Sequence, residues 1–180
     1  MKKGRLNQFH LTLSRSLQAR NIALHFHNVY KLPIVCLKYF NVFGPRQNPV
    51  SQYSGVIPKF ITAMLRGEAP VIYGDGMQSR DFMYVANIVK ANLWACERKE
   101  AVGHVINIAS GESYTLLDLY RNLSSIIGST TDPIFTDARI GDIKHSFASI
   151  ELAKSKLGYI REINWLTGLR KTVEWYSTRN

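Results

Sequence analysis

The feature that most constrains the fold is a near-continuous apolar run of strand length, Ile34 to Phe40, which follows the break Lys31-Leu32-Pro33. A strand that is apolar at nearly every position is typical of a parallel sheet covered on both faces, because a half-exposed strand alternates apolar and polar residues. Residues 41–49 are rich in Gly, Pro and Asn and predict a loop. Ligands of doubly wound sheets bind beyond the carboxyl ends of the strands, so this loop is a candidate site.

Strand and helix patterns alternate along the whole chain, which predicts an α/β fold. A chain of 180 residues with 46% hydrophobic residues is large enough for one domain with a core of its own. We expect strands at 34–40, 71–73, 104–108 and 133–136, and helices at 12–30, 55–66, 85–97, 115–127, 149–157 and 165–176. The third of these helices should bury Val85, Val89, Leu93 and Cys96, and the fourth should bury Leu116, Tyr120, Leu123 and Ile127.

The boundaries of three helices carry their own signals. Gly67, Gly128 and Gly158 each follow a helical pattern at the position where a left-handed residue ends a helix. Thr115 and Asp118 form a Thr-x-x-Asp pattern, which predicts a capping box at the start of the fourth helix.

The net charge of +10 is confined to the first part of the chain. No Asp or Glu precedes Glu68, whereas ten Lys and Arg residues do; from residue 68 onward, 13 basic residues balance 13 acidic ones. The basic residues are scattered, without interleaved aromatics and without a nucleic-acid recognition motif. A nucleic-acid-binding protein therefore remains the least favoured alternative.

Other function classes have little support in the sequence. Cys36 and Cys96 lack metal-ligand spacing and are expected to be buried free thiols, and the five histidines form no constellation, so no metal site is predicted. No apolar run approaches the ~20 residues of a membrane helix. The expected location is therefore cytoplasmic.

The stretch from Val71 to Val85 is the first candidate for a binding site. A short strand runs into Gly74-Asp75-Gly76, where two glycines can adopt positive φ, and the chain then turns back through Arg80. An arginine beside a tight turn suits a phosphate or a carboxylate, and so a nucleotide. The alternative is a structural turn in which Arg80 pairs with Asp81 or a neighbour.

Four motifs, in this order, resemble the extended short-chain dehydrogenase/reductase family, in its NAD-dependent epimerase/dehydratase group. The closest branch is the UDP-glucose and UDP-N-acetylglucosamine 4-epimerases. The motifs are YFNVFGPRQ at 39–47, SGVIPKF at 54–60, YGDG with RDF at 73–82, and RIGD at 139–142. The resemblance covers about residues 26–176. It implies the carboxyl-terminal half of that fold: part of a Rossmann-type parallel sheet with a small α/β substrate-binding region.

The resemblance also implies a role for each matching residue. Tyr39 and Phe40 would lie near the nicotinamide of NAD, Asn41 near the sugar diphosphate, and Val71 and Tyr73 along the uracil. Arg80 and Arg139 would bind the diphosphate and Asp142 a ribose hydroxyl; Arg139 has a surface ion pair with Asp137 or Asp142 as its alternative. The helix that would flank the nucleotide begins with Val56, Ile57 and Lys59. Ser146 matches a position that gates sugar size; a bulky residue there disfavours N-acetyl groups, so a serine indicates tolerance of N-acetylhexosamines.

The chain departs from the family at its catalytic centre. Family members take a proton from the sugar with the tyrosine of a Tyr-x-x-x-Lys pair, whose pKa the lysine lowers. Counting back from Tyr30, these two positions fall on Leu11 and Arg15, so no catalytic residue is assigned. The glycine-rich turn that would hold the cofactor pyrophosphate is also missing, which makes NAD binding by this chain alone doubtful.

Residues 1–25 suggest why the catalytic pair is missing. When codons for residues 7–16 are read from their third base, permitted synonymous choices give Pro, Ile, Ser, Pro, Tyr, Ala, Val, Ser, Lys, which resembles the family's catalytic segment. The tyrosine arises across Leu11 and Thr12 and the lysine across Arg15 and Ser16. The hypothesis is that residues 1–25 are a frame-shifted catalytic helix and that residues 26–180 are the nucleotide-sugar-binding part.

Two functions follow from these observations. The first is a truncated UDP-sugar 4-epimerase that is inactive by itself. The second is a non-catalytic module that binds UDP-sugars and associates with a second copy or with an amino-terminal partner. Loss of the first half of a doubly wound sheet would leave an open edge beside Ile34 to Phe40, which favours such association.

Overall fold

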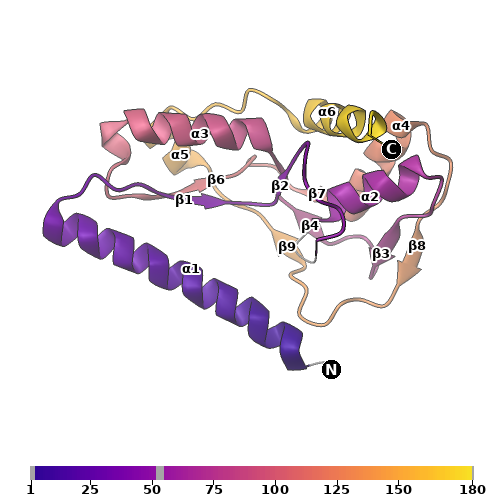
Figure 1. The fold of residues 1–180 in the computed structure, drawn as a ribbon, viewed down its shortest axis with the longest axis horizontal. Coiled ribbons are helices and arrows are strands. Elements are labelled where there is room, and N and C mark those ends of the chain that lie inside the picture. The colour runs from indigo at the N-terminus through magenta and orange to yellow at the C-terminus, as the bar shows by residue number, and fades with distance from the viewer. Residues whose placement is uncertain (1–2, 52–54, 180) are drawn as a thin grey trace.

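The computed structural model describes the backbone of residues 3–51 and 55–179, and the side chains of these ranges from residue 16 onward. Helices and short strands alternate along it, which confirms the expected α/β class (Figure 1). The helices are α1 (Lys3–Tyr30), α2 (Val56–Leu65), α3 (Val85–Glu97), a 3₁₀ turn η1 (Lys99–Ala101), α4 (Leu116–Ile127), α5 (Glu151–Leu157) and α6 (Trp165–Ser177). The strands are β1 (Cys36–Tyr39), β2 (Val42–Phe43), β3 (Val71–Tyr73), β4 (Ser79–Arg80), β5 (Met83–Tyr84), β6 (Val105–Ile108), β7 (Tyr114–Thr115), β8 (Ile134–Thr136) and β9 (His145–Ser146).

The strands form four small sheets, and nearly all of their pairings are parallel. β1 pairs with β6, in register from Cys36 opposite Val105 to Tyr39 opposite Ile108. β2 pairs with β5 and β3 pairs with β8, both parallel. In the fourth sheet, β4 lies between β9, which is parallel to it, and β7, which is antiparallel. Parallel pairs need long connections, and here these connections are the helices.

Two hydrophobic cores hold these layers together. The strand core lies between the β1–β6 pair and the helices α3 and α5, and it includes Ile106, Ile108 and Leu157, all fully buried. The helix core lies among α2, α4 and α6, and its centre includes Ile61, Leu119 and Leu169. Trp165 stacks on Phe82 and on Tyr114, with ring centroids 5.1 and 4.6 Å apart, and so joins the start of α6 to the strands.

The helix ends follow the sequence signals. Thr115 accepts a hydrogen bond from the Asp118 amide and Asp118 accepts one from the Thr115 amide, so the predicted capping box is present. Gly67, Gly128 and Gly158 all have positive φ, at +71°, +76° and +65°. The predicted stops of α2, α4 and α5 are therefore confirmed.

The packed face of α3 differs from the prediction. Val89 and Leu93 are each 56% exposed, Cys96 is exposed, and Val85 is half-buried; the buried residues are instead Asn87, Ile88 and Ala91. The reason is Asn87, whose amide donates to the Ile163 carbonyl at 2.8 Å and accepts from the Ile163 amide at 3.1 Å. This contact turns α3 so that a polar residue faces inward, which an apolar stripe cannot predict.

Two further expectations need smaller corrections. In α4 the residues Leu116 and Leu123 are buried as expected, but the third buried residue is Leu119, while Tyr120 and Ile127 pack at the edge of the helix core. β1 is not covered on both faces: Cys36 and Leu37 are half-buried, and Lys38 and Tyr39 are exposed. Its only partner among the described strands is β6, so one edge of β1 is open.

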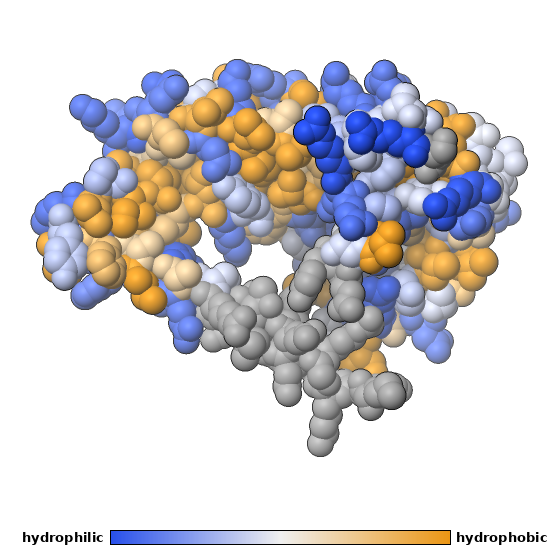
Figure 2. Space-filling model, viewed as in Figure 1, coloured by the Kyte–Doolittle hydropathy of each residue, from blue (hydrophilic) through white to orange (hydrophobic). Residues whose placement is uncertain are grey.

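The helix α1 stands apart from both cores. In Figure 1 its carboxyl-terminal end lies near β1, and the helix runs away from β1 towards its amino-terminal end. Among its described side chains, residues 16–30, none is buried and none belongs to either core. Figure 2 shows apolar side chains exposed along α3, β1 and the connection from α1. Within the part of the chain that the structure describes, no helix is long and apolar enough to cross a membrane.

Candidate functional site

One cavity of about 670 Å³ lies where the carboxyl end of β1, the start of α2 and the strands β3 and β4 meet. The loop after β1, predicted as a candidate site, contributes Asn41, Phe43 and Gln47 to its wall. The loop between β8 and β9 closes the opposite side with Arg139 and Asp142. Segments far apart in the sequence therefore converge on one volume.

Most of the residues that the sequence singled out for the substrate lie around this cavity. Its lining includes Asn41, Val56, Ile57, Lys59, Val71, Tyr73, Arg80, Arg139 and Asp142. Ser146 is outside the described lining, but it pairs with Arg80 across the β4–β9 ladder. The residues were selected from four separate motifs, and the fold brings them to one place.

The turn after β3 sets the position of Arg80. Gly74 and Gly76 adopt φ of +80° and +75°, a region that side chains other than glycine rarely occupy. A Cβ on Gly76 would also lie 2.9 Å from Leu117, at the start of α4. Asp75 accepts a hydrogen bond from the Met77 amide, which tightens the turn. The chain thus returns directly into β4, and Arg80 faces the cavity.

Arg80 is held by three acceptors from two segments. Its Nη1 donates to the carbonyls of Ser79 at 2.9 Å and Lys144 at 3.3 Å. Its Nη2 lies 2.6 Å from Oδ1 of Asp142, and the side chains of the two residues are 15% and 42% exposed. The ion pair considered with Asp81 is therefore wrong; the partner is a carboxylate 62 residues along the chain.

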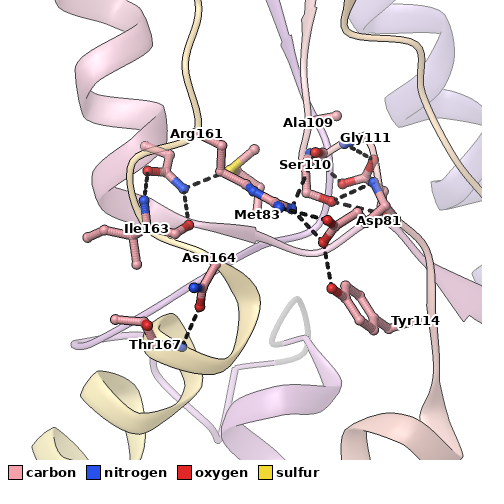
Figure 3. A network of polar contacts seen from close by, with 12 residues as sticks. Asp81, Met83, Ala109, Ser110, Gly111, Tyr114, Arg161, Ile163, Asn164 and Thr167 are labelled. Atoms are coloured by element: carbon pink, nitrogen blue, oxygen red, sulfur yellow. Dashed lines mark hydrogen bonds and ion pairs between the residues drawn. The ribbon is translucent and has the colours of Figure 1, made fainter.

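Asp81 points in the opposite direction, into the protein. Its carboxylate accepts hydrogen bonds from the amides of Ser110 at 2.7 Å and Gly111 at 3.1 Å (Figure 3). Complete burial raises the pKa of this carboxyl, and the hydrogen bonds from Ser110 and Gly111 oppose the rise. The backbone carbonyl of Asp81 accepts a hydrogen bond from the side-chain amide of Asn41 at 2.9 Å. Asp81 therefore also positions a residue that lines the cavity.

Next to Asp81, an ion pair joins two loops. Arg161 donates to Glu112 at 2.7 Å and lies close to the carbonyl of Ser110, and the Tyr114 hydroxyl donates to Glu112 at 2.5 Å. Arg161 holds the pKa of Glu112 below its usual range, whereas burial and the nearby carboxylate raise the pKa of Tyr114 to about 12. The network fixes the loop that carries Ser110 and Gly111.

Arg139 is bound by an aromatic ring. Its guanidinium carbon lies 3.7 Å from the centroid of Tyr73, a cation–π contact. The ion pair with Asp137 or Asp142 that was its alternative is not found among the described residues. Arg139 thus stands beside the turn that carries Arg80, on the same cavity wall.

Two further features make the cavity suited to an anion. The first turn of α2 lines it through Gly55, Val56 and Ile57, and the amino-terminal end of a helix carries partial positive charge. Lys59 adds a full charge to the lining. With Arg80 and Arg139, three cations face Asp142 and Glu68, the two carboxylates of the lining.

Tyr39 and Phe40 lie outside the described lining, at the end of β1. The Tyr39 hydroxyl donates to Asn92 of α3 at 2.8 Å, so this ring points to the α3 side of the strand pair. Because successive side chains of a strand point to opposite faces, Phe40 points to the other side. Their assignment to a nicotinamide remains a prediction.

The sequence reasoning missed several lining residues. Gln47 and Gln78 fall inside motifs that were recognised, but were not assigned a role. Glu68 and Leu116 had no signal of their own, since their place in the wall depends on packing. Gln47 is the most informative of these: its Oε1 is buried and has no hydrogen-bond partner among the described residues.

Comparison with known proteins gives a consistent result. The family described as "NAD dependent epimerase/dehydratase family" matches residues 16–109. A Methanocaldococcus jannaschii protein provisionally named UDP-glucose 4-epimerase is 34% identical over 155 residues, which are 86% of this chain and 49% of the relative.

Two solved structures share the fold. The UDP-glucose 4-epimerase of Thermotoga maritima, solved with UDP-glucose, has a TM-score of 0.84 and 36% identity, over 92% of this chain and 52% of its own. The UDP-N-acetylglucosamine 4-epimerase of Methanobrevibacter ruminantium, solved with UDP-N-acetylmuramic acid, has a TM-score of 0.83 and 45% identity, over 93% of this chain and 52% of its own. The chain thus spans about half the length of these relatives. The family match and the shared fold agree with the four motifs, and the chain belongs to the NAD-dependent epimerase/dehydratase family.

Proposed function

We propose that this chain is the nucleotide-sugar-binding half of a UDP-sugar 4-epimerase, with the cavity as its UDP-sugar site. The observation that carries the proposal is the convergence of Arg80, Arg139, Lys59 and the start of α2 on one cavity. A diphosphate has its charge spread over several oxygens, and charge-assisted hydrogen bonds to it are stronger away from bulk water.

The remaining walls suit the rest of the ligand. Val71 and Tyr73 offer an apolar edge and a ring to a flat base, and Asp142 offers an acceptor to a ribose hydroxyl. The unpaired Oε1 of Gln47 would gain a donor from a sugar or base, since a buried acceptor without a partner is unfavourable. Ser146 is a small residue at the position that gates sugar size in the family, which supports tolerance of N-acetylated sugars beside UDP-glucose.

The proposal includes the expectation that this chain alone is not catalytic. In the intact family NAD takes a hydride from sugar C4 and returns it to the other face. Of the residues that would hold NAD, this chain offers Tyr39 and Phe40, and Tyr39 is already bonded to Asn92. The sequence has no Gly-x-Gly-x-x-Gly or Gly-x-x-Gly-x-x-Gly turn for the cofactor pyrophosphate. The residues present do not fit a whole dinucleotide, so we derive no step through it.

For residues 1–25 we keep the frame-shift hypothesis as a proposal. A helix translated from a shifted frame would not have been selected for an apolar face that packs on the core. This agrees with the described part of α1, which has no buried side chain. Leu11 and Arg15 themselves lie where side chains are not described. The family match begins at residue 16, inside the segment assigned to the shifted frame, and this part of the match counts against a boundary as late as residue 25. The decisive stretch is codons 7–16, which would carry the Tyr-x-x-x-Lys codons. The nucleotide sequence tests the proposal directly: a third-base frame without Tyr-x-x-x-Lys codons would exclude it.

The open edge of β1 supports a partner for this half of the fold. Among the described strands β1 pairs with β6 alone, so its other side has no strand partner there, and Val89 and Leu93 of the neighbouring α3 are exposed. Such a surface favours association with a further strand, from an amino-terminal half or from a second copy. Light scattering with and without an added amino-terminal half from a relative distinguishes the two.

Calorimetric titration tests the UDP site. We expect UDP and UDP-N-acetylglucosamine to bind, and Arg80→Ala to weaken UDP by about tenfold or more, because it removes a charged hydrogen bond to phosphate. Arg170→Ala is the matched control, since Arg170 is exposed on α6, away from the cavity. Equal losses in both variants, or no binding of UDP at all, would contradict the proposal. Turnover of a UDP-sugar by the purified chain with NAD would contradict the absence of catalysis.

A further inference from the structure

The contact between Arg80 and Asp142 has a consequence for which ligands the cavity admits. Two backbone carbonyls already take Nη1 of Arg80, and the Asp142 carboxylate takes Nη2 at 2.6 Å. Only 15% of the Arg80 side chain is exposed, while 42% of Asp142 is exposed. The carboxylate therefore occupies Nη2, the terminal nitrogen that the backbone carbonyls leave free for an incoming anion.

We propose that Asp142 is a specificity-determining residue that excludes bare anions, such as phosphate and pyrophosphate, and admits ribonucleoside diphosphates. The inference rests on the proposed function, because it concerns the same cavity. It adds a role in rejection to the acceptor role that the family resemblance implies for Asp142.

The argument is one of exchange between two partners. A bare anion that binds Arg80 must displace the Asp142 carboxylate. The displaced carboxylate has then lost its hydrogen bond, and its negative charge lies beside the bound anion and repels it. A ribonucleoside diphosphate displaces the same carboxylate but brings hydroxyl groups that can donate to it. Discrimination of this kind uses repulsion against the wrong ligand as well as attraction to the right one.

The position of Asp142 allows this exchange. It lies in an exposed segment between β8 and β9, in which residues 134–145 are all exposed. Arg80 stays in place when the carboxylate leaves, because its contacts to Ser79 and Lys144 are to backbone carbonyls. Arg139 remains on the ring of Tyr73 and so stays available to the same phosphate groups.

The experiment compares three ligands on three proteins by calorimetric titration at constant ionic strength. The ligands are pyrophosphate, UDP and 2′,3′-dideoxy-UDP, which lacks the ribose hydroxyls. The proteins are the wild type, Asp142→Asn and Asp137→Asn. Asp137 is the matched control, an exposed carboxylate of the same segment that is outside the described lining of the cavity.

We expect Asp142→Asn to bind pyrophosphate about tenfold more tightly than the wild type, as the competing carboxylate is gone. The preference of the wild type for UDP over dideoxy-UDP should fall to about twofold or less in this variant. Asp137→Asn should change neither quantity by more than about twofold, since an exposed charge outside the site is screened. In the double variant Arg80→Ala/Asp142→Asn, the gain for pyrophosphate should disappear.

Failure of this inference is distinguishable from failure of the proposed function. Unchanged or weaker pyrophosphate binding in Asp142→Asn, while the wild type binds UDP, would overturn the exclusion role alone. An equal gain in Asp137→Asn would also overturn it, because the effect would then be one of net charge. A wild type that fails to bind UDP would overturn the proposed function itself.

Discussion

The helices α1 and α4 differ in the contacts that stabilise them. α1 runs for 28 residues, yet none of its described side chains is buried. α4 runs for only 12 residues, but it buries Leu116, Leu119 and Leu123, begins in a capping box and ends at a left-handed glycine. Helix length therefore says little about what a helix contributes, because most helical stability in proteins comes from packing of one face.

The same contrast separates two regions of the molecule. Both hydrophobic cores and the cavity are built from described residues that follow Lys31, and the described part of α1 adds none. The part from residue 34 onward should thus keep its structure and its binding site without α1. Four predictions test how the contacts of the two regions differ in their contribution to stability and binding, from the largest expected effect to the smallest.

A matched pair of leucine substitutions gives the largest difference. Leu119→Ala removes a fully buried side chain of the helix core and should lower the free energy of unfolding by about 2–5 kcal/mol. Leu17→Ala removes a side chain of α1 that is 47% exposed, and it should change the free energy of unfolding by less than about 0.5 kcal/mol. Denaturant titration measures both. Equal losses would show that α1 is packed as firmly as α4.

Loss of the cap of α4 should have an intermediate effect. Thr115→Ala removes the hydroxyl that accepts from the Asp118 amide at 3.0 Å and should cost about 1 kcal/mol of stability. Thr115→Ser keeps a hydroxyl and serves as the control, with stability close to the wild type. A loss in the serine variant as large as in the alanine variant would mean that the threonine methyl, not the cap, matters.

The ion pair of Glu112 with Arg161 should contribute in a pH-dependent way. The pKa of Glu112 is lowered in the folded state by the hydrogen bond from Arg161, so its contribution is present above the usual value of 4.5 and is lost as the pH falls through the lowered pKa. Because Glu112 is 42% exposed, Glu112→Gln should cost at most about 1 kcal/mol at pH 7. The difference from the wild type should shrink as the pH is lowered below 4.5, as measured by thermal unfolding. A difference that grows on acidification would contradict this sign.

Removal of α1 should have the smallest effect. A chain that begins at residue 31 should bind UDP within about twofold of the full chain, and its free energy of unfolding should stay within about 1 kcal/mol. Titration and denaturant unfolding on both chains provide the measurement. A larger loss of either would break the comparison and assign α1 a structural role.

Features that depend on neighbouring residues were predictable from the sequence. The ends of α2, α4 and α5 follow from glycines at positive φ, and the cap of α4 follows from a Thr-x-x-Asp pattern. The alternation of strands and helices gave the α/β class. Among the cavity residues, Arg80 and the loop after β1 followed from local patterns, whereas the roles of the others came from family motifs.

Features that depend on distant partners were not predictable. The packed face of α3 is set by Asn87 and Ile163, which are 76 residues apart. Pairing with Asp81 or a neighbour was the structural alternative for Arg80, but its carboxylate partner is Asp142, which reaches it across the β4–β9 pairing. In each case the local pattern left two acceptable choices, and a contact between remote segments decided between them.

The burial of Asp81 has a consequence for the speed and strength of ligand capture. The residue is anchored through its carboxylate to Ser110 and Gly111, through its carbonyl to Asn41 and through its amide to Ser146. Arg80 is its immediate neighbour and therefore starts from a backbone that is already fixed. A ligand that docks on a pre-ordered arginine loses little conformational entropy on binding. We therefore expect association to involve the displacement of the Asp142 carboxylate but no slow ordering step of the β4 backbone.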